Sequence, residues 1–384
     1  MLIVVTPYLV ITLGIDHYGI YVSGLALCSL YIGILNFDFN LTVVKKIARI
    51  KNDAEMLNDA INEVVSVKLL LLVALVVLAV IVYFIVPSFF ERPQLYFNFT
   101  LLLVANYITF DWLLLGLNSF KFLSLLKFLK FGLFASGMFL WVHSPDDFVL
   151  LPLIDAFAVF MVGIGVSIWM FRKFHWNLKL YTLAHCFNYI VKNRDAFFNL
   201  NLPSHFGNIL ILVTSHFGSL IQVGLLQIVL KYSGGFAMLS NMLSMVLYPK
   251  NAKEQGLFNF SEKSLLVIGV ISSLLMVGSI PFIKWVFPDL VSQFEFNQLQ
   301  YAVLIAVPVP FCIALISIYG TNGLILLNKD RIYFYATSIA IGAMLLLSSF
   351  FTTLLFFAPI IIYTISRALH GYISYVWYRS IKKD

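Results

Sequence analysis

The chain has 384 residues, of which 61% are hydrophobic and only 11% are charged, and its formal net charge is +7. Soluble domains carry about 25% charged residues, so this composition excludes an ordinary soluble protein and indicates one that folds in lipid. The positive charge does not indicate a nucleic-acid partner. Its lysines and arginines fall in short stretches between apolar segments, as the orientation of membrane helices requires.

The chain begins with two apolar segments. The first, Met1–Leu13, would be only about 20 Å long as a helix, so it is either a thin complete helix or the remainder of a longer one. A turn at Gly14–Tyr18 leads to the second segment, at about residues 20–39, and a basic cluster follows. The cluster consists of Lys45, Lys46, Arg49 and Lys51. Such clusters stay on the cytoplasmic side, so the second segment sets the predicted threading of the chain.

Ten more apolar segments follow at intervals typical of membrane helices. They lie near 64–87, 98–117, up to Val142, 149–170, 206–230, 235–248, 264–287, 300–320, 332–351 and 353–375. The fold class predicted from them is an all-α polytopic membrane protein with about 12 transmembrane helices, of which the first and the eighth are short. Most of the 25 lysines and arginines fall in alternate loops and at the carboxyl end, which predicts that both termini are cytoplasmic.

A long polar interval divides the chain near its middle. We expect an N-terminal six-helix bundle over 1–171, a cytoplasmic connecting segment over 172–204, and a C-terminal six-helix bundle over 205–384. Two bundles in parallel orientation are an arrangement found among transporters.

Five short motifs carry a resemblance to a known family. They are Gly14-Ile-Asp-His-Tyr-Gly-Ile, Asn40-Leu-Thr-Val-Val-Lys-Lys-Ile-Ala, Asp111-Trp-Leu-Leu-Leu-Gly-Leu-Asn-Ser-Phe-Lys, Ser144-Pro-Asp-Asp-Phe and Leu247-Tyr-Pro-Lys. The chain resembles bacterial polysaccharide-export flippases of the Wzx type along nearly its whole length. It departs from the family at Asp38, where glycine is usual, and at Leu115 and Asn118, where glutamine and glutamate are common.

The resemblance implies both a fold and a task. The fold is that of the multidrug/oligosaccharidyl-lipid/polysaccharide exporters, which is MATE-like. The task is to carry an undecaprenyl-pyrophosphate-linked oligosaccharide, an O-antigen or capsule repeat unit, across the bacterial inner membrane. The implied partners are that lipid-linked glycan and the lipid bilayer, together with an O-antigen polymerase and a chain-length regulator.

Polar side chains on the predicted seventh span are candidates for a substrate cavity. On a helix over 206–230, Asn208, Ser215, Ser219 and Gln222 would lie on one face, with His216 at its flank. Such a stripe must face protein or water rather than lipid. Two interpretations stay open: a hydrated cavity that binds sugar hydroxyls, or hydrogen bonds that join neighbouring helices. His216 is equally compatible with a proton relay and with a structural role.

Charged side chains inside the other spans are the second group of candidates. Asp111 and Asp155 would each cost about 2.5–3.5 kcal/mol at the bilayer centre, so each should face the bundle interior or a partner. Arg367 and His370 could meet a pyrophosphate, although anchoring at the membrane interface explains them as well. We expect Lys68 to extend its ammonium to the surface.

Asp38 lies near the inner end of the predicted second span. We expect it at the surface rather than at a proton site.

Several kinds of catalytic chemistry have no signature here. The chain contains no G-x-x-x-x-G-K-[ST] loop, no H-E-x-x-H motif and no clustered Cys/His site, so we expect no cofactor, no metal and no enzymatic activity. Two alternatives to a flippase remain. A multidrug or cation exporter of the same fold would need an acidic, aromatic cavity. A polytopic O-antigen polymerase or ligase would need a large outer loop, whereas the longest outer connector expected is 288–298.

Overall fold

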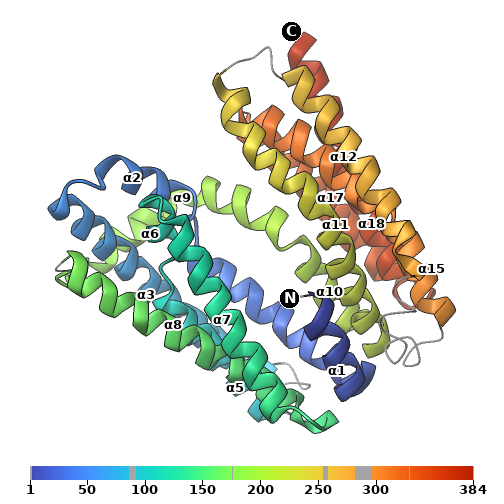
Figure 1. The fold of residues 1–384 in the computed structure, drawn as a ribbon, viewed down its shortest axis with the longest axis horizontal. Coiled ribbons are helices and arrows are strands. Elements are labelled where there is room, and N and C mark those ends of the chain that lie inside the picture. The colour runs from blue at the N-terminus through green and yellow to red at the C-terminus, as the bar shows by residue number, and fades with distance from the viewer. Residues whose placement is uncertain are drawn as a thin grey trace. The chain divides into compact units, whose positions relative to one another are not determined.

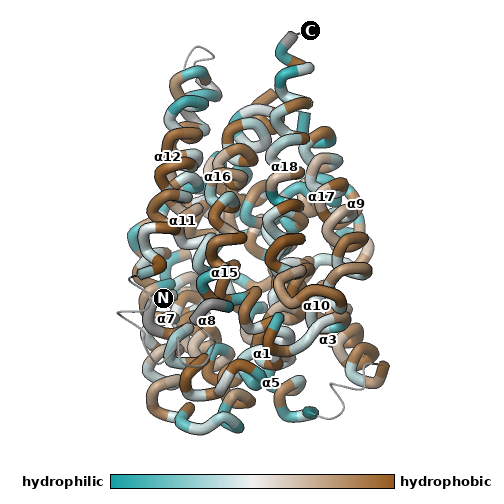
Figure 2. Tube along the Cα trace, turned by 90° about the vertical axis from the view of Figure 1, so that its right-hand side faces the viewer, coloured by the Kyte–Doolittle hydropathy of each residue, from teal (hydrophilic) through white to brown (hydrophobic). Residues whose placement is uncertain are grey.

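The computed structural model describes residues 2–85, 92–174, 176–253, 258–281, 296–327 and 329–383. Within these residues every regular element is helical, and nine helices are long and apolar enough to cross a membrane. This confirms the prediction of an all-α polytopic membrane protein. Figure 2 shows hydrophobic residues along the length of α12 (Phe258–Gly278) and hydrophilic residues toward its beginning. The predicted outer connector over 288–298 lies largely outside the described residues.

The chain forms two compact units (Figure 1). Unit 1 consists of Met1–Ser23 and Phe206–Asp384, and unit 2 consists of Gly24–His205. The helix α1 (Leu2–Asn36) therefore contributes its beginning to unit 1 and its end to unit 2. The division into two six-helix bundles with a connecting segment over 172–204 stays a prediction.

Unit 2 contains the end of α1 and the helices that follow it to His205. These are α2 (Thr42–Ile50), α3 (Ala54–Ile85), α5 (Pro93–Ala105), the 3-10 turn η1 (Asn106–Ile108), α6 (Asp111–Gly116), α7 (Phe120–Trp141), the 3-10 turn η2 (Pro145–Leu150), α8 (Leu151–Phe174) and α9 (Leu183–Ser204). A core at one end of the unit buries Phe39, Ile47, Leu57 and Trp112. This core joins α2 to α3 and α6, so the short amphipathic α2 is held through its apolar face.

Unit 1 combines the beginning of α1 with the helices after His205. These are α10 (Phe206–Phe217), α11 (Leu220–Lys253), α12, α15 (Phe296–Ala306), α16 (Pro308–Leu315), the π-helix η4 (Ile316–Ile325), α17 (Asp330–Phe351) and α18 (Ala358–Lys383). When the two arms of α1 are counted separately and the short α10 and the less apolar α18 are added, the described residues contain about twelve such segments, as predicted.

The turn predicted at Gly14–Tyr18 is a break in the helix α1 at a single residue, Gly14. Gly14 has φ 73° and ψ 162°, while the residues on both sides are helical. This positive φ lies in a region that glycine adopts without steric cost and that other residues avoid. The second arm of α1 therefore begins at Ile15, five residues earlier than the predicted second span.

The predicted boundary between the seventh and eighth spans is wrong. The sequence predicts a helix over 206–230 and a second over 235–248, but α10 ends at Phe217 and α11 runs without a break from Leu220 to Lys253. The reason is a capping box at the start of α11. The Ser219 hydroxyl accepts a hydrogen bond from the Gln222 amide at 3.3 Å, and the Gln222 carboxamide oxygen accepts one from the Ser219 amide at 2.8 Å. The eighth segment is therefore longer than predicted.

The two helices on either side of this cap fold back on each other. A Cβ added to Gly207, near the beginning of α10, would lie 3.3 Å from the Leu230 side chain of α11. A Cβ added to Gly218 would lie 2.5 Å from the Gln222 carboxamide oxygen and 2.9 Å from the Thr214 carbonyl oxygen, so this turn has no room for a larger residue.

Lys68 does not reach the surface as predicted. Its side chain is buried, and its ammonium donates hydrogen bonds to the carbonyl oxygens of Asn106 and Thr109, both at 3.1 Å, and to the Thr109 hydroxyl at 3.3 Å. These acceptors lie at the two ends of η1, between the end of α5 and the start of α6; the Asn106 carbonyl also accepts from the amide and hydroxyl of Thr109, whereas the Thr109 carbonyl lies after the last residue of η1. The lysine caps a broken helix inside unit 2.

We expect Lys68→Met to destabilise the protein by about 1–3 kcal/mol, because the carbonyl group of Thr109 loses its donor and that of Asn106 loses one of its donors. Removing a buried charge offsets part of that cost. Thermal unfolding in detergent measures the change. Lys51→Met, at an exposed position after α2, is the control and should leave the transition unchanged. An unchanged transition for both variants would contradict the capping role.

Candidate substrate site

Two ion pairs join neighbouring spanning helices of unit 2. Lys127 on α7 lies 3.6 Å from the Asp111 carboxylate on α6, and Lys130 lies 3.5 Å from the Asp155 carboxylate on α8. The two lysines are three residues apart and therefore share one face of α7. Asp111 and Asp155 thus each have a partner, which is one of the two placements expected for them.

These pairs are not buried within unit 2. The side-chain exposed fractions are 62% for Lys127 and 49% for Asp111, and 40% and 24% for Lys130 and Asp155. Half-exposed charges on a membrane-spanning helix cannot face hydrocarbon at an acceptable cost, so this face of α7 must meet water or other protein. Phe128, between the two lysines in sequence, is 74% exposed and suits a lipid-facing position.

Thiol labelling distinguishes these two faces of α7. In a background in which the three native cysteines are replaced by alanine, Lys130→Cys and Asp155→Cys should react with a membrane-impermeant maleimide. Phe128→Cys should react at least about tenfold more slowly, because thiolate formation is suppressed in hydrocarbon. Equal labelling at positions 128 and 130 would contradict a hydrated face on α7.

Arg367 on α18 provides a cation inside unit 1. Its guanidinium lies 4.2 Å from the ring centre of Phe206 and 5.5 Å from that of Tyr363. Among the described residues no carboxylate pairs with it, and its buried Nε has no hydrogen-bond partner. The aromatic rings hold the plane of the guanidinium in place while leaving its hydrogen-bond donors available.

Lys231 is a second cation of unit 1, and the sequence analysis did not single it out. It lies within the spanning part of α11, where its ammonium is 3.4 Å from the Thr6 hydroxyl and 3.4 Å from the Tyr18 hydroxyl. Within the described ranges it forms no ion pair. The wrong helix boundary concealed it, because Lys231 appeared to belong to a loop between two spans.

Arg367 lies at the beginning of α10. It stacks on Phe206, the first residue of that helix, whose amino end carries a partial positive charge. The Lys231 ammonium instead faces Thr6 and Tyr18 of α1. Unit 1 therefore holds two cations that have no carboxylate partner among the described residues.

His370 lies one turn after Arg367 on α18 and is fully buried. Its Nε2 is 3.1 Å from the Thr337 hydroxyl, its ring lies 5.6 Å from that of Tyr333, and its Nδ1 has no partner among the described groups. Complete burial is inconsistent with an anchor at the membrane interface. A direct role for His370 in substrate binding stays a prediction.

The polar residues predicted to form one stripe do not share a helix. Asn208 and Ser215 lie on α10, where the Ser215 hydroxyl donates to the Leu212 carbonyl oxygen at 2.8 Å. His216 is exposed and packs edge-on against Phe217. Ser219 and Gln222 form the cap of α11, beyond the turn. The stripe is therefore split between two helices that run in opposite directions.

The Gln222 side chain forms hydrogen bonds between helices. Its carboxamide nitrogen donates to the carbonyl oxygens of Thr352, Leu355 and Phe356 at 3.3, 3.2 and 3.0 Å, and its carboxamide oxygen serves the cap. The side chain is 7% exposed. For Gln222 this geometry favours interhelical hydrogen bonds over contact with sugar, whereas Asn208 and Ser215 stay candidates for the cavity.

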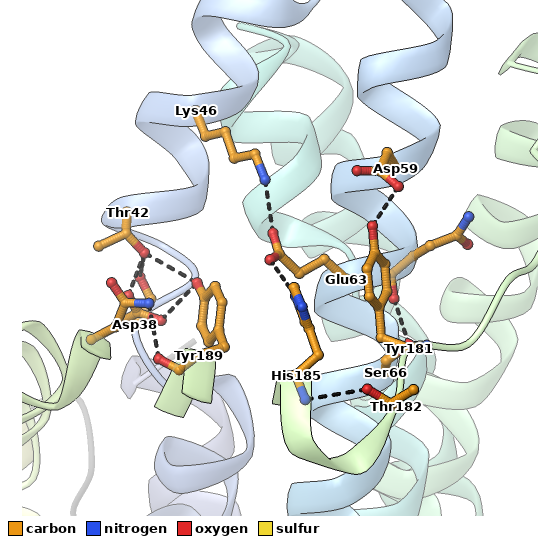
Figure 3. A network of polar contacts seen from close by, with 12 residues as sticks. Asp38, Thr42, Lys46, Asp59, Glu63, Ser66, Tyr181, Thr182, His185 and Tyr189 are labelled. Carbon is orange, nitrogen blue, oxygen red and sulfur yellow. Dashed lines mark hydrogen bonds and ion pairs between the residues drawn. The ribbon is translucent and has the colours of Figure 1, made fainter. Parts of the chain in front are cut away.

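A polar network at one end of unit 2 was not predicted from the sequence (Figure 3). Glu63 on α3 binds Lys46 of α2 at 2.7 Å and His185 of α9 at 2.9 Å. The Tyr181 hydroxyl donates to the Asp59 carboxylate, and this bond raises the pKa of Tyr181 to about 12. The network attaches α9 to α2 and α3 across more than a hundred residues of sequence.

Asp38 belongs to the same network and is not at the surface as predicted. Its carboxylate is fully buried and accepts hydrogen bonds from the Thr42 hydroxyl and, at 3.2 Å, from the Tyr189 hydroxyl of α9. The prediction failed because the residues that cover Asp38 come from α9, which the sequence could not place.

The described residues offer no cluster of three or more His, Cys, Asp or Glu side chains that could hold a metal ion. Cys28, Cys186 and Cys312 are buried free thiols.

Comparisons with solved structures agree with this architecture. The chain is similar to a multidrug resistance MATE family transporter of the MOP superfamily in its inward-facing conformation, with a TM-score of 0.70 at 15% identity over 98% of this chain and 96% of the other. It is also similar to a MATE protein in complex with MaL6, with a TM-score of 0.56 at 15% identity over 100% and 95% of the chains. These similarities confirm the MATE-like transporter fold.

Comparisons of sequence point to a narrower group. A protein of Escherichia coli (strain K12) named "Putative O-antigen transporter" is 23% identical over 360 residues, which cover 91% of this chain and 85% of that protein. The family model described as "Polysaccharide biosynthesis protein" matches residues 1–284. With nine helices apolar and long enough to span a membrane in its described residues, a MATE-like fold and this match over residues 1–284, the chain belongs to the polysaccharide biosynthesis protein family and is a multi-pass membrane protein.

Proposed function

We propose that this protein is a flippase that moves an undecaprenyl-pyrophosphate-linked oligosaccharide from the cytoplasmic to the periplasmic leaflet by alternating access. The observation that carries the proposal is the pair of cations that have no carboxylate partner among the described residues, Arg367 on α18 and Lys231 in the spanning part of α11. An unneutralised cation is costly at this depth, so its presence indicates an anionic ligand.

Arg367 suits a pyrophosphate for reasons of geometry. A guanidinium binds two phosphate oxygens through parallel hydrogen bonds, and its stacking on Phe206 fixes the plane in which those bonds form. Lys231 adds a point charge beside the hydroxyl groups of Thr6 and Tyr18, which can also bind phosphate oxygens. In this proposal the lipid tail stays in the bilayer while unit 1 holds the charged head group.

The paired charges of unit 2 suit the sugars. Lys127–Asp111 and Lys130–Asp155 offer donors and acceptors on one half-exposed face without adding net charge. Sugar hydroxyl groups both donate and accept hydrogen bonds, so a face of this kind binds glycans of different sequence. Asn208 and Ser215 are further candidates for such contacts.

The threading follows from the basic segments. We place both termini and the network around Glu63 on the cytoplasmic side of the bacterial inner membrane, because Lys45, Lys46 and Arg49 are adjacent to it. An O-antigen polymerase and a chain-length regulator are the partners that would consume the product in the periplasm.

Two observations argue against the alternatives. A cation exporter needs unpaired acidic groups, whereas Asp111 and Asp155 are each paired with a lysine. The cations of unit 1 would repel a cationic drug as well. A polymerase or ligase needs a periplasmic catalytic constellation, and the charged groups described here lie within spanning helices or beside the basic segments.

The decisive experiment is gene deletion followed by analysis of lipid-linked repeat units in each leaflet. The proposal expects complete repeat units to accumulate on the cytoplasmic leaflet and complementation to release them. Repeat units that reach the periplasm and remain unpolymerised would instead support the alternative function of a polymerase or ligase. Normal glycan export together with drug sensitivity would support the multidrug exporter.

A further inference from the structure

Asp38 is an ionisable group in an unusual position. It lies in the turn between α1 and α2, after the last residue of the spanning helix, and its side chain is 0% exposed. A buried carboxylate is costly unless a cation or several hydrogen bonds compensate it. Among the described residues no lysine, arginine or histidine lies within ion-pair distance of Asp38.

The groups that face Asp38 are hydroxyls and one carboxylate. Thr42 donates to one carboxylate oxygen and Tyr189 to the other. Glu63 approaches from α3, but Lys46 and His185 both bind Glu63, so neither of these cations compensates Asp38.

Aromatic rings keep water away from this carboxyl group. The rings of Phe37 and Phe39 lie 6.3 and 6.1 Å from that of Tyr189, and both phenylalanines are buried. Phe197 stacks on Phe37 at 4.8 Å, so two turns of α9 cover the site. The covering helix can therefore decide whether Asp38 is solvated.

Burial raises the pKa of Asp38 above its ordinary value of 3.8, and the Glu63 carboxylate raises it further, while the hydroxyls of Thr42 and Tyr189 lower it in part. Between the ordinary and the raised pKa, the folded protein binds a proton that the unfolded chain has released. Folding stability therefore falls as the pH rises through this window.

We propose that Asp38 is a proton-binding site whose occupancy controls how firmly α9 is held against the turn between α1 and α2. The ionised carboxylate accepts hydrogen bonds from Tyr189 and Thr42, but these do not offset its loss of water where no cation lies beside it among the described residues. Ionisation therefore favours release of α9, which returns the carboxylate to water. A proton taken up from the aqueous phase neutralises the carboxyl group, which then donates to the Thr42 oxygen and still accepts from Tyr189, and the hold on α9 strengthens.

The position of α9 gives this site a means to affect transport. The helix ends at Ser204, and the chain enters α10 of unit 1 at Phe206. A change in the hold on α9 therefore acts on the covalent link between the units. Coupling of proton uptake to transport rests on the proposed function, whereas proton binding at Asp38 does not.

A sodium ion is the other occupant that these oxygens suggest. The hydroxyl groups of Thr42 and Tyr189 both donate hydrogen bonds to the carboxylate, an arrangement that suits a carboxyl group and its proton without an ion. The experiment includes sodium at constant pH as a competing outcome.

Infrared difference spectroscopy of the purified full chain tests the binding site directly. A protonated carboxyl band should persist to a pH above the ordinary range for aspartate in the wild type and should be absent in Asp38→Asn. Asp195→Asn removes an exposed carboxylate from the same helix as Tyr189 and should leave the band unchanged. Tyr189→Phe should move its titration to higher pH, because it removes a hydrogen bond to the carboxylate.

Cys186 reports on the hold on α9. It is buried one turn before Tyr189, so with Cys28 and Cys312 replaced by alanine it is a native probe for that helix. The ratio of its labelling rates in the wild type and Asp38→Asn, taken at each pH, cancels the titration of the thiol itself. We expect labelling of the wild type to be several-fold faster than that of Asp38→Asn at pH values above the titration of Asp38, and equal to it at pH values below.

Three results would overturn the inference: a carboxyl band that survives in Asp38→Asn, a labelling ratio that does not change with pH, or a ratio that follows sodium at constant pH. Neither measurement uses a transported molecule. A failure of the proposed function would therefore leave both results intact, and their failure would leave the flippase proposal standing.

Discussion

Replacing Arg367 with glutamine is expected to reduce export of the lipid-linked glycan by about 10- to 100-fold, because charge-assisted hydrogen bonds to phosphate contribute about 1.5–3 kcal/mol. Glutamine keeps a planar polar end but loses the charge and most of the donors. Arg367→Lys should recover only part of the activity, because an ammonium group cannot bind two oxygens in one plane or stack as well on Phe206. Flipping of a fluorescent lipid-pyrophosphate glycan in reconstituted vesicles measures the effect.

The matched control is Arg331→Gln, an exposed arginine in the first turn of α17 in the same unit. It should reconstitute and transport like the wild type. Equal activity of Arg367→Gln and Arg331→Gln would remove the anion-binding role of Arg367 and with it the main support for a pyrophosphate substrate.

Gln222→Leu should destabilise the protein by about 2–5 kcal/mol, the largest loss of stability expected for a single substitution here. The change removes one acceptor from the amide of Ser219 and one donor shared by three carbonyl oxygens, each in a buried or half-buried place. The hydrogen bonds of Gln222 join the turn before α11 to the end of α17 and the turn before α18, so the loss should appear as a lower unfolding temperature in detergent.

Two further variants separate the parts of this role. Gln227→Leu lies five residues later on α11. The Gln227 side chain forms no hydrogen bond among the described residues, so this variant should leave the unfolding temperature unchanged or raise it. Ser219→Ala removes only the cap and should cost about 1 kcal/mol. If Gln222→Leu and Ser219→Ala destabilise the protein equally, the hydrogen bonds to the end of α17 contribute nothing.

The helix boundary near Gly218 shows how a local signal was missed. A Ser-x-x-Gln pattern before an apolar run is a recognised helix start, and Ser219-Leu-Ile-Gln222 has this form. Hydropathy alone ranks the stretch from 206 to 230 as continuous, because the two-residue turn contains no charge. Attention to the cap would have placed Lys231 inside a span and marked it as a candidate before the structure was known.

Other outcomes had no local signal. Lys68 and Asp38 were both expected at the surface, since each lies near the end of a predicted span, where a long or polar side chain reaches water easily. Their partners are Thr109, on a break in another helix, and Tyr189, which follows Asp38 by 151 residues. No feature of the sequence near Lys68 or Asp38 predicts these partners.

The residues alone were enough to identify a helical protein of the lipid bilayer and its resemblance to polysaccharide exporters. Its composition requires a lipid environment, where a helix satisfies the backbone hydrogen bonds of each apolar segment within that segment. Which charges are neutralised became visible in the packed structure, because neutralisation depends on contacts between helices far apart in the chain. Asp111 and Asp155 proved to be paired, whereas Arg367 and Lys231 were left without carboxylate partners among the described residues. Side-chain charge is encoded residue by residue, but its compensation is a property of packing.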